Sequence, residues 1–172
     1  MRLFTGLDLP VHVSAALDRL IETLRPAARL RWTPVANLHV TTKFIGEWPP
    51  ARLDEMKAAL ATVPGRAPIS VAVRGVELKP RLFWAKVHGP ALADLARDLD
   101  TALARLGVAR EQRTFNPHLT LARINKPVPL NIAGLTATDF GSFEADRFFL
   151  YLSEPGSAGS LYTKLAEFPF AK

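Results

Sequence analysis

Two short stretches of the sequence carry the same order of polar residues. Residues 37–42 read Asn-Leu-His-Val-Thr-Thr, and residues 116–121 read Asn-Pro-His-Leu-Thr-Leu. Side chains two positions apart on a β-strand point to the same side, so each stretch would present an imidazole beside a hydroxyl. The candidate residues are His39, Thr41, His118 and Thr120.

These groups suit the hydrolysis of a phosphodiester. The reaction needs a base that takes a proton from water, an acid that protonates the departing oxygen, and donors for the phosphoryl oxygens. An imidazole can play either proton role near neutral pH, because its pKa is about 6.5. Threonine hydroxyls can donate to the non-bridging oxygens, whereas a carboxylate there would repel the phosphate. The set therefore requires no metal ion.

Other interpretations of the histidines are weaker. A single strand histidine followed by threonine is usually structural, and only the pairing of two such stretches favours a site. Neither stretch contains a carboxylate that would complete a metal site, and no Gly-x-Ser-x-Gly elbow indicates a serine hydrolase. His12 at a helix start and His88 in a turn are expected to be surface residues without a role.

Arg123 and Phe44 lie five residues after their respective histidines. Arg123 could neutralise a phosphate and Phe44 could stack on a base, but a solvated strand end and a core residue explain them equally well. Regular alternation places both side chains opposite their histidines. Contact with a ligand would therefore require a strand end, a twist or a bulge.

The elements that must position these residues follow from hydrophobic periodicity. The alternation of helices with antiparallel hairpins favours an α+β fold over a doubly wound parallel sheet. The similarity of the two stretches indicates two similar lobes, each lending one strand to a shared cleft. Strands are expected at residues 3–9, 38–45, 69–78, 82–88, 119–124 and 147–152, and helices at residues 17–24, 53–63 and 92–106.

Composition limits the class of protein further. The chain has 22 Lys and Arg against 16 Asp and Glu, a net charge of +6, so a basic face is available for a polyanion. The absence of cysteine excludes disulfides and thiolate sites and fits a reducing compartment, so we expect a cytoplasmic location. No uncharged apolar run reaches the roughly 18 residues that a membrane helix needs, so no membrane association is expected.

The paired His-x-Thr-x stretches resemble the signature of the two-histidine phosphoesterase superfamily, specifically the LigT-like RNA 2′,3′-cyclic phosphodiesterases. Residues 2–7 resemble the opening strand of that family, and residues 37–47 and 115–123 resemble its two motifs. Ser153-Glu154 followed by residues 159–162 resembles its closing strand pair. The likeness covers nearly the whole chain, so we expect one two-lobed domain over residues 1–172. Thr42 departs from the family, in which a bulkier apolar residue is common.

The resemblance implies a bilobal fold, with two antiparallel sheets around a central cleft and helices packed outside. It also implies hydrolysis of RNA 2′,3′-cyclic phosphate ends to 2′-phosphates without a metal or cofactor, by a chain that we expect to be a monomer. In that reaction His39 would protonate the leaving 3′-oxygen, His118 would activate water, and Thr41 and Thr120 would anchor the phosphate. Two alternatives stay open: a related enzyme that cleaves or ligates 2′,5′-linked RNA, and a module that binds RNA ends without turnover.

Overall fold

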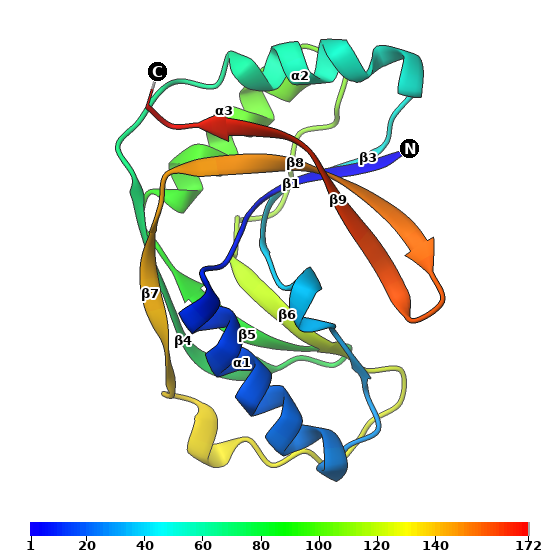
Figure 1. Cartoon of the computed structure of the whole chain (residues 1–172), viewed down its shortest axis with the longest axis vertical. Helices are drawn as coiled ribbons and strands as arrows, with labels where there is room; N and C mark the ends of the chain where they lie inside the picture. Colours follow the sequence, from blue (N-terminus) through cyan, green and yellow to red (C-terminus); the bar gives the residue numbers. More distant parts are fainter. Residues whose placement is uncertain (172) are drawn as a thin grey trace.

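Two antiparallel sheets form the two halves of the molecule in the computed structural model, which describes residues 1–171 (Figure 1). One sheet contains, in spatial order, β3 (Val40–Glu47), β1 (Arg2–Leu7), β8 (Arg147–Gly156) and β9 (Gly159–Pro169). The other contains β2 (Arg31–Trp32), β6 (His118–Arg123), β5 (Leu82–His88), β4 (Ile69–Leu78) and β7 (Asp139–Ala145). The expected α+β class with two antiparallel sheets is confirmed.

The helices are divided between the two sheets. α1 (Val11–Leu24) packs on β7 of the five-stranded sheet, whereas α3 (Leu92–Ala104) packs on β3 and α2 (Leu53–Ala61) packs on α3 and β9 (Figure 1). Short 3₁₀ turns complete the described chain: η1 (Arg25–Ala27), η2 (Val35–Asn37), η3 (Pro50–Arg52) and η4 (Ala133–Leu135). No helix within residues 1–171 combines the length and the apolar character needed to cross a membrane.

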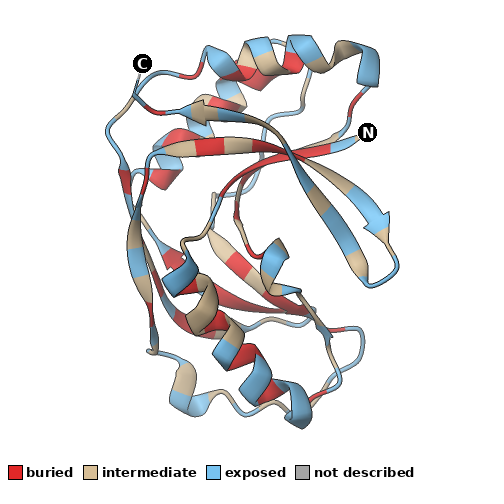
Figure 2. Ribbon diagram, viewed as in Figure 1, coloured by how far each residue is buried: buried red, intermediate tan, exposed pale blue. Residues whose placement is uncertain are grey.

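Each long helix is held by one apolar face. The buried residues of α3 recur every three or four positions, as do those of α1, and Figure 2 shows buried faces alternating with exposed ones along α1. Each fully buried leucine contributes about 2 kcal/mol. α3 ends at Ala104, two residues before the predicted end at residue 106, and Gly107 then turns the chain with φ +86°, a left-handed conformation that glycine adopts without strain.

Three strands were not predicted from local pattern: β2, β7 and β9, of which β9 was indicated only by the family resemblance of residues 159–162. β7 contains Asp139, Gly141, Ser142 and Glu144, which are poor strand formers, and it exists because it pairs with β4 along nearly its full length. β2 has only two residues and is defined by its pairing with β6. β2 and β7 therefore depend on their neighbours in the sheet and have little propensity of their own.

Candidate active site

His39 lies directly before β3, and both of its ring nitrogens have partners. Nδ1 is 2.7 Å from the carbonyl oxygen of Asn37. Because a carbonyl oxygen can only accept, Nδ1 carries a proton and donates it. Nε2 is 2.9 Å from Oγ1 of Thr41, so in the neutral ring it accepts a hydrogen bond from that hydroxyl. Nε2 is therefore the nitrogen of His39 that is available for proton transfer.

His118 is the first residue of β6 and is held in the same way. Its Nδ1 is 2.8 Å from the carbonyl oxygen of Asn116, which again fixes the proton on Nδ1. Within residues 1–171, Nε2 of His118 has no hydrogen-bond partner, and its lone pair is free to accept a proton. The two histidines thus share one arrangement, in which the carbonyl two residues earlier holds the ring.

The two motifs meet although they belong to different sheets. β3 and β6 contact each other. Burial is the main cause that lowers the pKa of His39; the Asn37 carbonyl and the Asp8 carboxylate oppose it, and the charge of His118 lowers the pKa further. Burial also lowers the pKa of His118, against the opposing effect of the Asn116 carbonyl. Both imidazoles are therefore neutral at neutral pH in the free protein.

Aromatic rings from distant parts of the chain enclose the histidines. The Phe4 ring centroid lies 4.6 Å from that of His39, and the Tyr162 ring meets His39 edge-on at 5.1 Å. The Trp84 ring lies 4.0 Å from His118. No role for these three rings was predicted, because nothing local in the sequence links β1, β9 or β5 to a particular histidine.

A β-bulge brings Phe44 to the side of His39. In the pairing of β1 with β3, Gly6 faces Thr41 and Thr5 faces Lys43, so Thr42 has no partner. A bulge reverses the alternation of the residues that follow it. Phe44 is consequently the register partner of Phe4, with ring centroids 6.4 Å apart, and its side chain is 65% exposed.

The regular alternation predicted for residues 38–45 is therefore wrong from Lys43 onward. It places Lys43 on the face of His39, but Lys43 is buried. Its Nζ contacts Oδ1 of Asp100 at 2.5 Å and the carbonyl oxygen of Ala109 at 2.8 Å. The bulge residue Thr42 is also buried, and its hydroxyl is satisfied by the hydroxyl of Thr5 at 2.8 Å.

The second motif contains the matching bulge. In the pairing of β5 with β6, Trp84 faces Thr120 and Phe83 faces Ala122, so Leu121 has no partner. Leu121 lies three residues after its histidine, as Thr42 does in the first motif. The exposed residue Arg123 then follows on the face of Thr120. The structure thus meets, in both motifs, the condition under which Phe44 and Arg123 can reach a ligand.

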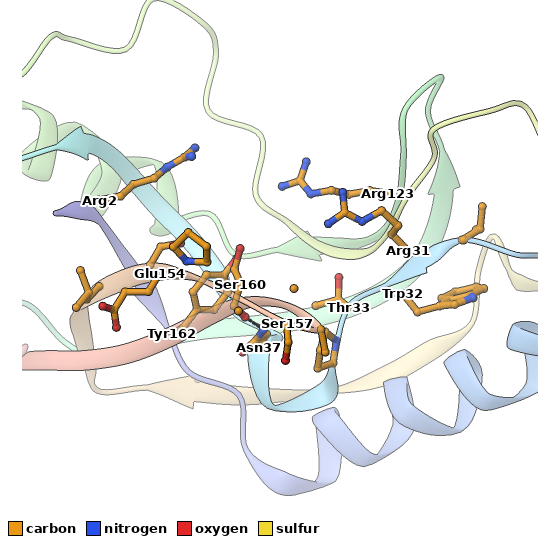
Figure 3. Close-up of a pocket in the computed structure, with 18 of the residues that line it drawn as sticks. Arg2, Arg31, Trp32, Thr33, Asn37, Arg123, Glu154, Ser157, Ser160 and Tyr162 are labelled. Carbon is orange, nitrogen blue, oxygen red and sulfur yellow. Dashed lines mark hydrogen bonds between the residues drawn. The ribbon is translucent and has the colours of Figure 1, made fainter.

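A large open cavity adjoins the site. It has a volume of about 1040 Å³ and lies between β2, the end of β6 and the turn that joins β8 to β9 (Figure 3). Tyr162 lines this cavity and also contacts His39, so the cavity lies beside the first motif, although none of His39, Thr41, His118 and Thr120 is among its lining residues. Arg123 lines it as well, together with Arg31 of β2.

Other candidate groups are absent or lie elsewhere. His12 and His88 are exposed, as predicted, and their Nε2 atoms contact the carbonyl oxygens of Ser142 and Arg74. Among residues 1–171, no three His, Cys, Asp or Glu side chains cluster closely enough to hold a metal ion. The paired imidazoles are therefore the chemical groups on which an interpretation of this cleft depends.

Comparison with known sequences identifies the class of protein. The sequence profile described as "LigT like Phosphoesterase" matches residues 7–87 and again residues 82–162, which together span most of the chain. The chain therefore belongs to the LigT-like phosphoesterase family.

Named relatives and solved structures agree with this assignment. The chain is 31% identical over 183 residues to an RNA 2′,3′-cyclic phosphodiesterase of Thermus thermophilus, covering 98% of this chain and 89% of the relative. It is 29% identical over 181 residues to one of Methanothermobacter thermautotrophicus, covering 98% of both. The crystal structure of the Thermus thermophilus protein TT0787 superposes with a TM-score of 0.85 at 30% identity, over 99% of this chain and 98% of that one. Apo Escherichia coli LigT, at 23% identity, shares the fold with a TM-score of 0.83 over the same shares.

Proposed function

We propose that the chain hydrolyses the 2′,3′-cyclic phosphate at the end of an RNA to a 2′-phosphate, without a metal ion. The observation that carries this proposal is the matched pair of imidazoles, each with Nδ1–H donated to the carbonyl of Asn37 or Asn116 and with Nε2 left for proton transfer. The relatives named RNA 2′,3′-cyclic phosphodiesterase, from bacteria and archaea, support the choice of substrate.

The reaction needs one neutral and one charged imidazole. Nε2 of His118 takes a proton from a water molecule whose oxygen attacks phosphorus, while the bond from phosphorus to the 3′-oxygen breaks. The Nε2 proton of the His39 imidazolium passes to that departing oxygen. The products are a 3′-hydroxyl and a 2′-phosphate, and solvent resets the two rings for the next turnover.

The remaining groups of the two motifs hold the phosphate. The hydroxyls of Thr41 and Thr120 donate to the non-bridging oxygens, on which negative charge increases in the transition state. When substrate is bound, Thr41 exchanges its contact with His39 for one with a phosphoryl oxygen. Arg123, on the face of Thr120, neutralises the phosphate, and the exposed ring of Phe44 stacks on the terminal base.

The test is turnover of an oligonucleotide that ends in a 2′,3′-cyclic phosphate, with the product identified by phosphorus NMR. His39→Ala and His118→Ala are each expected to lower kcat by about 10²-fold or more, the range for loss of a general acid or base. His88→Ala is the matched control, since it removes an exposed imidazole outside the cleft, and it should retain wild-type turnover.

The alternatives give different results in the same assay. Binding of the RNA end without product would indicate a binding module. Faster turnover of 2′,5′-linked oligonucleotides than of cyclic ends would indicate a related phosphoesterase with another substrate. Wild-type turnover in either the His39 or the His118 variant would contradict the two-imidazole mechanism.

A further inference from the structure

Two arginines lie side by side next to the active site without an acidic partner. Arg31 of β2 and Arg123 of β6 are register partners on neighbouring antiparallel strands. Residues placed in this way share a face with Cβ atoms about 5 Å apart, and like charges there destabilise the sheet. Neither guanidinium forms an ion pair or side-chain hydrogen bond within residues 1–171. Local costs of this kind are expected at functional or strained sites.

Both arginines line the cavity beside the candidate active site. Figure 3 shows Arg31 and Arg123 reaching in the same direction into the cavity, with Arg2 on the opposite wall. Of the two carboxylates in the lining, Glu47 is paired with the N-terminal amino group at 3.4 Å, which leaves Glu154. The unpaired charge of the cavity is therefore positive, and it is spread along the walls.

The size and the walls of the cavity favour a polymer over a single nucleotide. Its volume of about 1040 Å³ slightly exceeds the range of roughly 300–1,000 Å³ for small-molecule sites, and it is open to solvent. The β8–β9 turn forms one wall, and Nδ2 of Asn37 donates to the carbonyl oxygen of Ser160 in this wall at 2.6 Å. This bond ties the wall to the segment that also holds His39.

The cavity lies beside residues that belong to or contact both motifs. Tyr162 lines it and contacts His39, and Arg123 belongs to the strand that carries His118. An RNA whose cyclic end is held between the histidines can continue only from its 5′ side. A positively charged groove with polar walls is the surface that binds single-stranded nucleic acid, and guanidinium binds phosphate in a bidentate manner.

We propose that this cavity binds the RNA strand on the 5′ side of the reacting nucleotide, with Arg31 contacting the phosphodiester that joins the terminal nucleotide to its neighbour. The proposal rests on the proposed function, and it assigns Arg31 a role in substrate length preference. Arg123 faces the reacting phosphate, and its neighbour Arg31 faces the next one.

The experiment compares two substrates. Cytidine 2′,3′-cyclic phosphate has no upstream phosphate, whereas a trinucleotide with the same end has two. Arg31→Gln is expected to raise KM for the trinucleotide about tenfold, as for loss of one charge-assisted hydrogen bond, and to leave kcat unchanged. KM for the mononucleotide should change less than twofold, which also shows that the variant is folded. The plot of the logarithm of the trinucleotide binding constant against the logarithm of the salt concentration should become less steep by about 0.7, the contribution of one phosphate contact.

Arg105→Gln is the matched control, because Arg105 is exposed at the end of α3 and does not line the cavity. Equal changes in KM for both substrates, no change for either, or the same effect from Arg105→Gln would overturn the proposal. If the wild type hydrolyses neither substrate, the proposed function fails by itself. The role of the cavity is then tested by fluorescence anisotropy with a trinucleotide that ends in a 2′-phosphate. Binding to Arg31→Gln that is tenfold weaker than to the wild type supports the proposed role of Arg31, and equal binding overturns it.

Discussion

Replacing Lys43 with methionine is expected to lower the free energy of unfolding by about 3 kcal/mol. Lys43 and Asp100 are 7% and 15% exposed, and breaking a buried ion pair costs about 3–5 kcal/mol because one charge is left uncompensated. Asp100 would still accept the hydrogen bond from the backbone N–H of Glu111 at 3.1 Å and would still have Arg110 at 3.7 Å. Because its charge stays partly compensated, the expected loss of stability is at the lower end of that range. Methionine keeps the apolar stem of Lys43 packed.

The assay is urea denaturation followed by tryptophan fluorescence, with two control variants. Arg97→Met breaks the exposed pair of Arg97 with Asp94 and should cost less than about 1 kcal/mol. The double variant Lys43→Met with Asp100→Leu removes both buried charges and should recover most of the lost stability, since apolar replacement of a buried pair is often neutral.

The pH dependence gives a second check. Burial alone would raise the pKa of Asp100, but Lys43, the Glu111 N–H and Arg110 outweigh it and hold the pKa below the ordinary value of 3.8. The stability contributed by this carboxylate is therefore present above pH 3.8 and is lost as the pH falls through the lower folded-state pKa. The wild type and Lys43→Met should converge at acid pH. A single-variant loss below about 1 kcal/mol at neutral pH would refute this reasoning.

Three further predictions concern the catalytic cleft. Because burial lowers the pKa of both His39 and His118, kcat/KM should rise as His118 loses its proton, fall as His39 loses its proton, and peak below the ordinary imidazole value of 6.5. Bound phosphate favours imidazolium, so the kcat optimum should lie at higher pH, and a plateau extending to about pH 9 would show that His39 is not the acid. A Cβ on Gly6 would lie 2.9 Å from the Val40 carbonyl oxygen and 3.4 Å from Cδ2 of His39, so Gly6→Ala should lose about 1–3 kcal/mol and lower kcat about tenfold by displacing the motif. Gly134→Ala, with open space around the new methyl, is its control in the same denaturation and turnover assays, and wild-type values for both variants would contradict the expectation. Turnover should persist in excess chelator, since neither motif stretch contains a carboxylate; loss that one divalent ion restores would instead identify a metal site.

The sequence alone is sufficient to predict the side chains of the two motifs and the class of the fold. The relation between His39 and Thr41, and between His118 and Thr120, is local, because side chains two positions apart on a regular strand share a face. The apolar faces of α1 and α3 are likewise local, since their period matches the helical turn. These predictions needed no knowledge of which strands pair.

The tertiary structure determines the features that depend on contacts between segments distant in the sequence, such as the register of paired strands and the face on which a side chain lies. Local alternation places Phe44 and Arg123 away from their histidines, and it is correct only while the strand stays regular. The bulges at Thr42 and Leu121 arise from the pairing of β3 with β1 and of β6 with β5, and they reverse that alternation. A strand register is set by both strands together, so neither motif could reveal its own bulge.

The surroundings of the histidines have the same origin. The contact of Trp84 with His118, the burial of Lys43 against Asp100 and the position of Arg31 beside Arg123 each join segments that are far apart in sequence. Such contacts are fixed by the order of strands in the sheets and by the packing of α3 on β3. Spacing along the chain therefore indicated the candidate groups of the two motifs, whereas the pairing of strands determined which rings enclose them and which charged side chains lie beside the cleft.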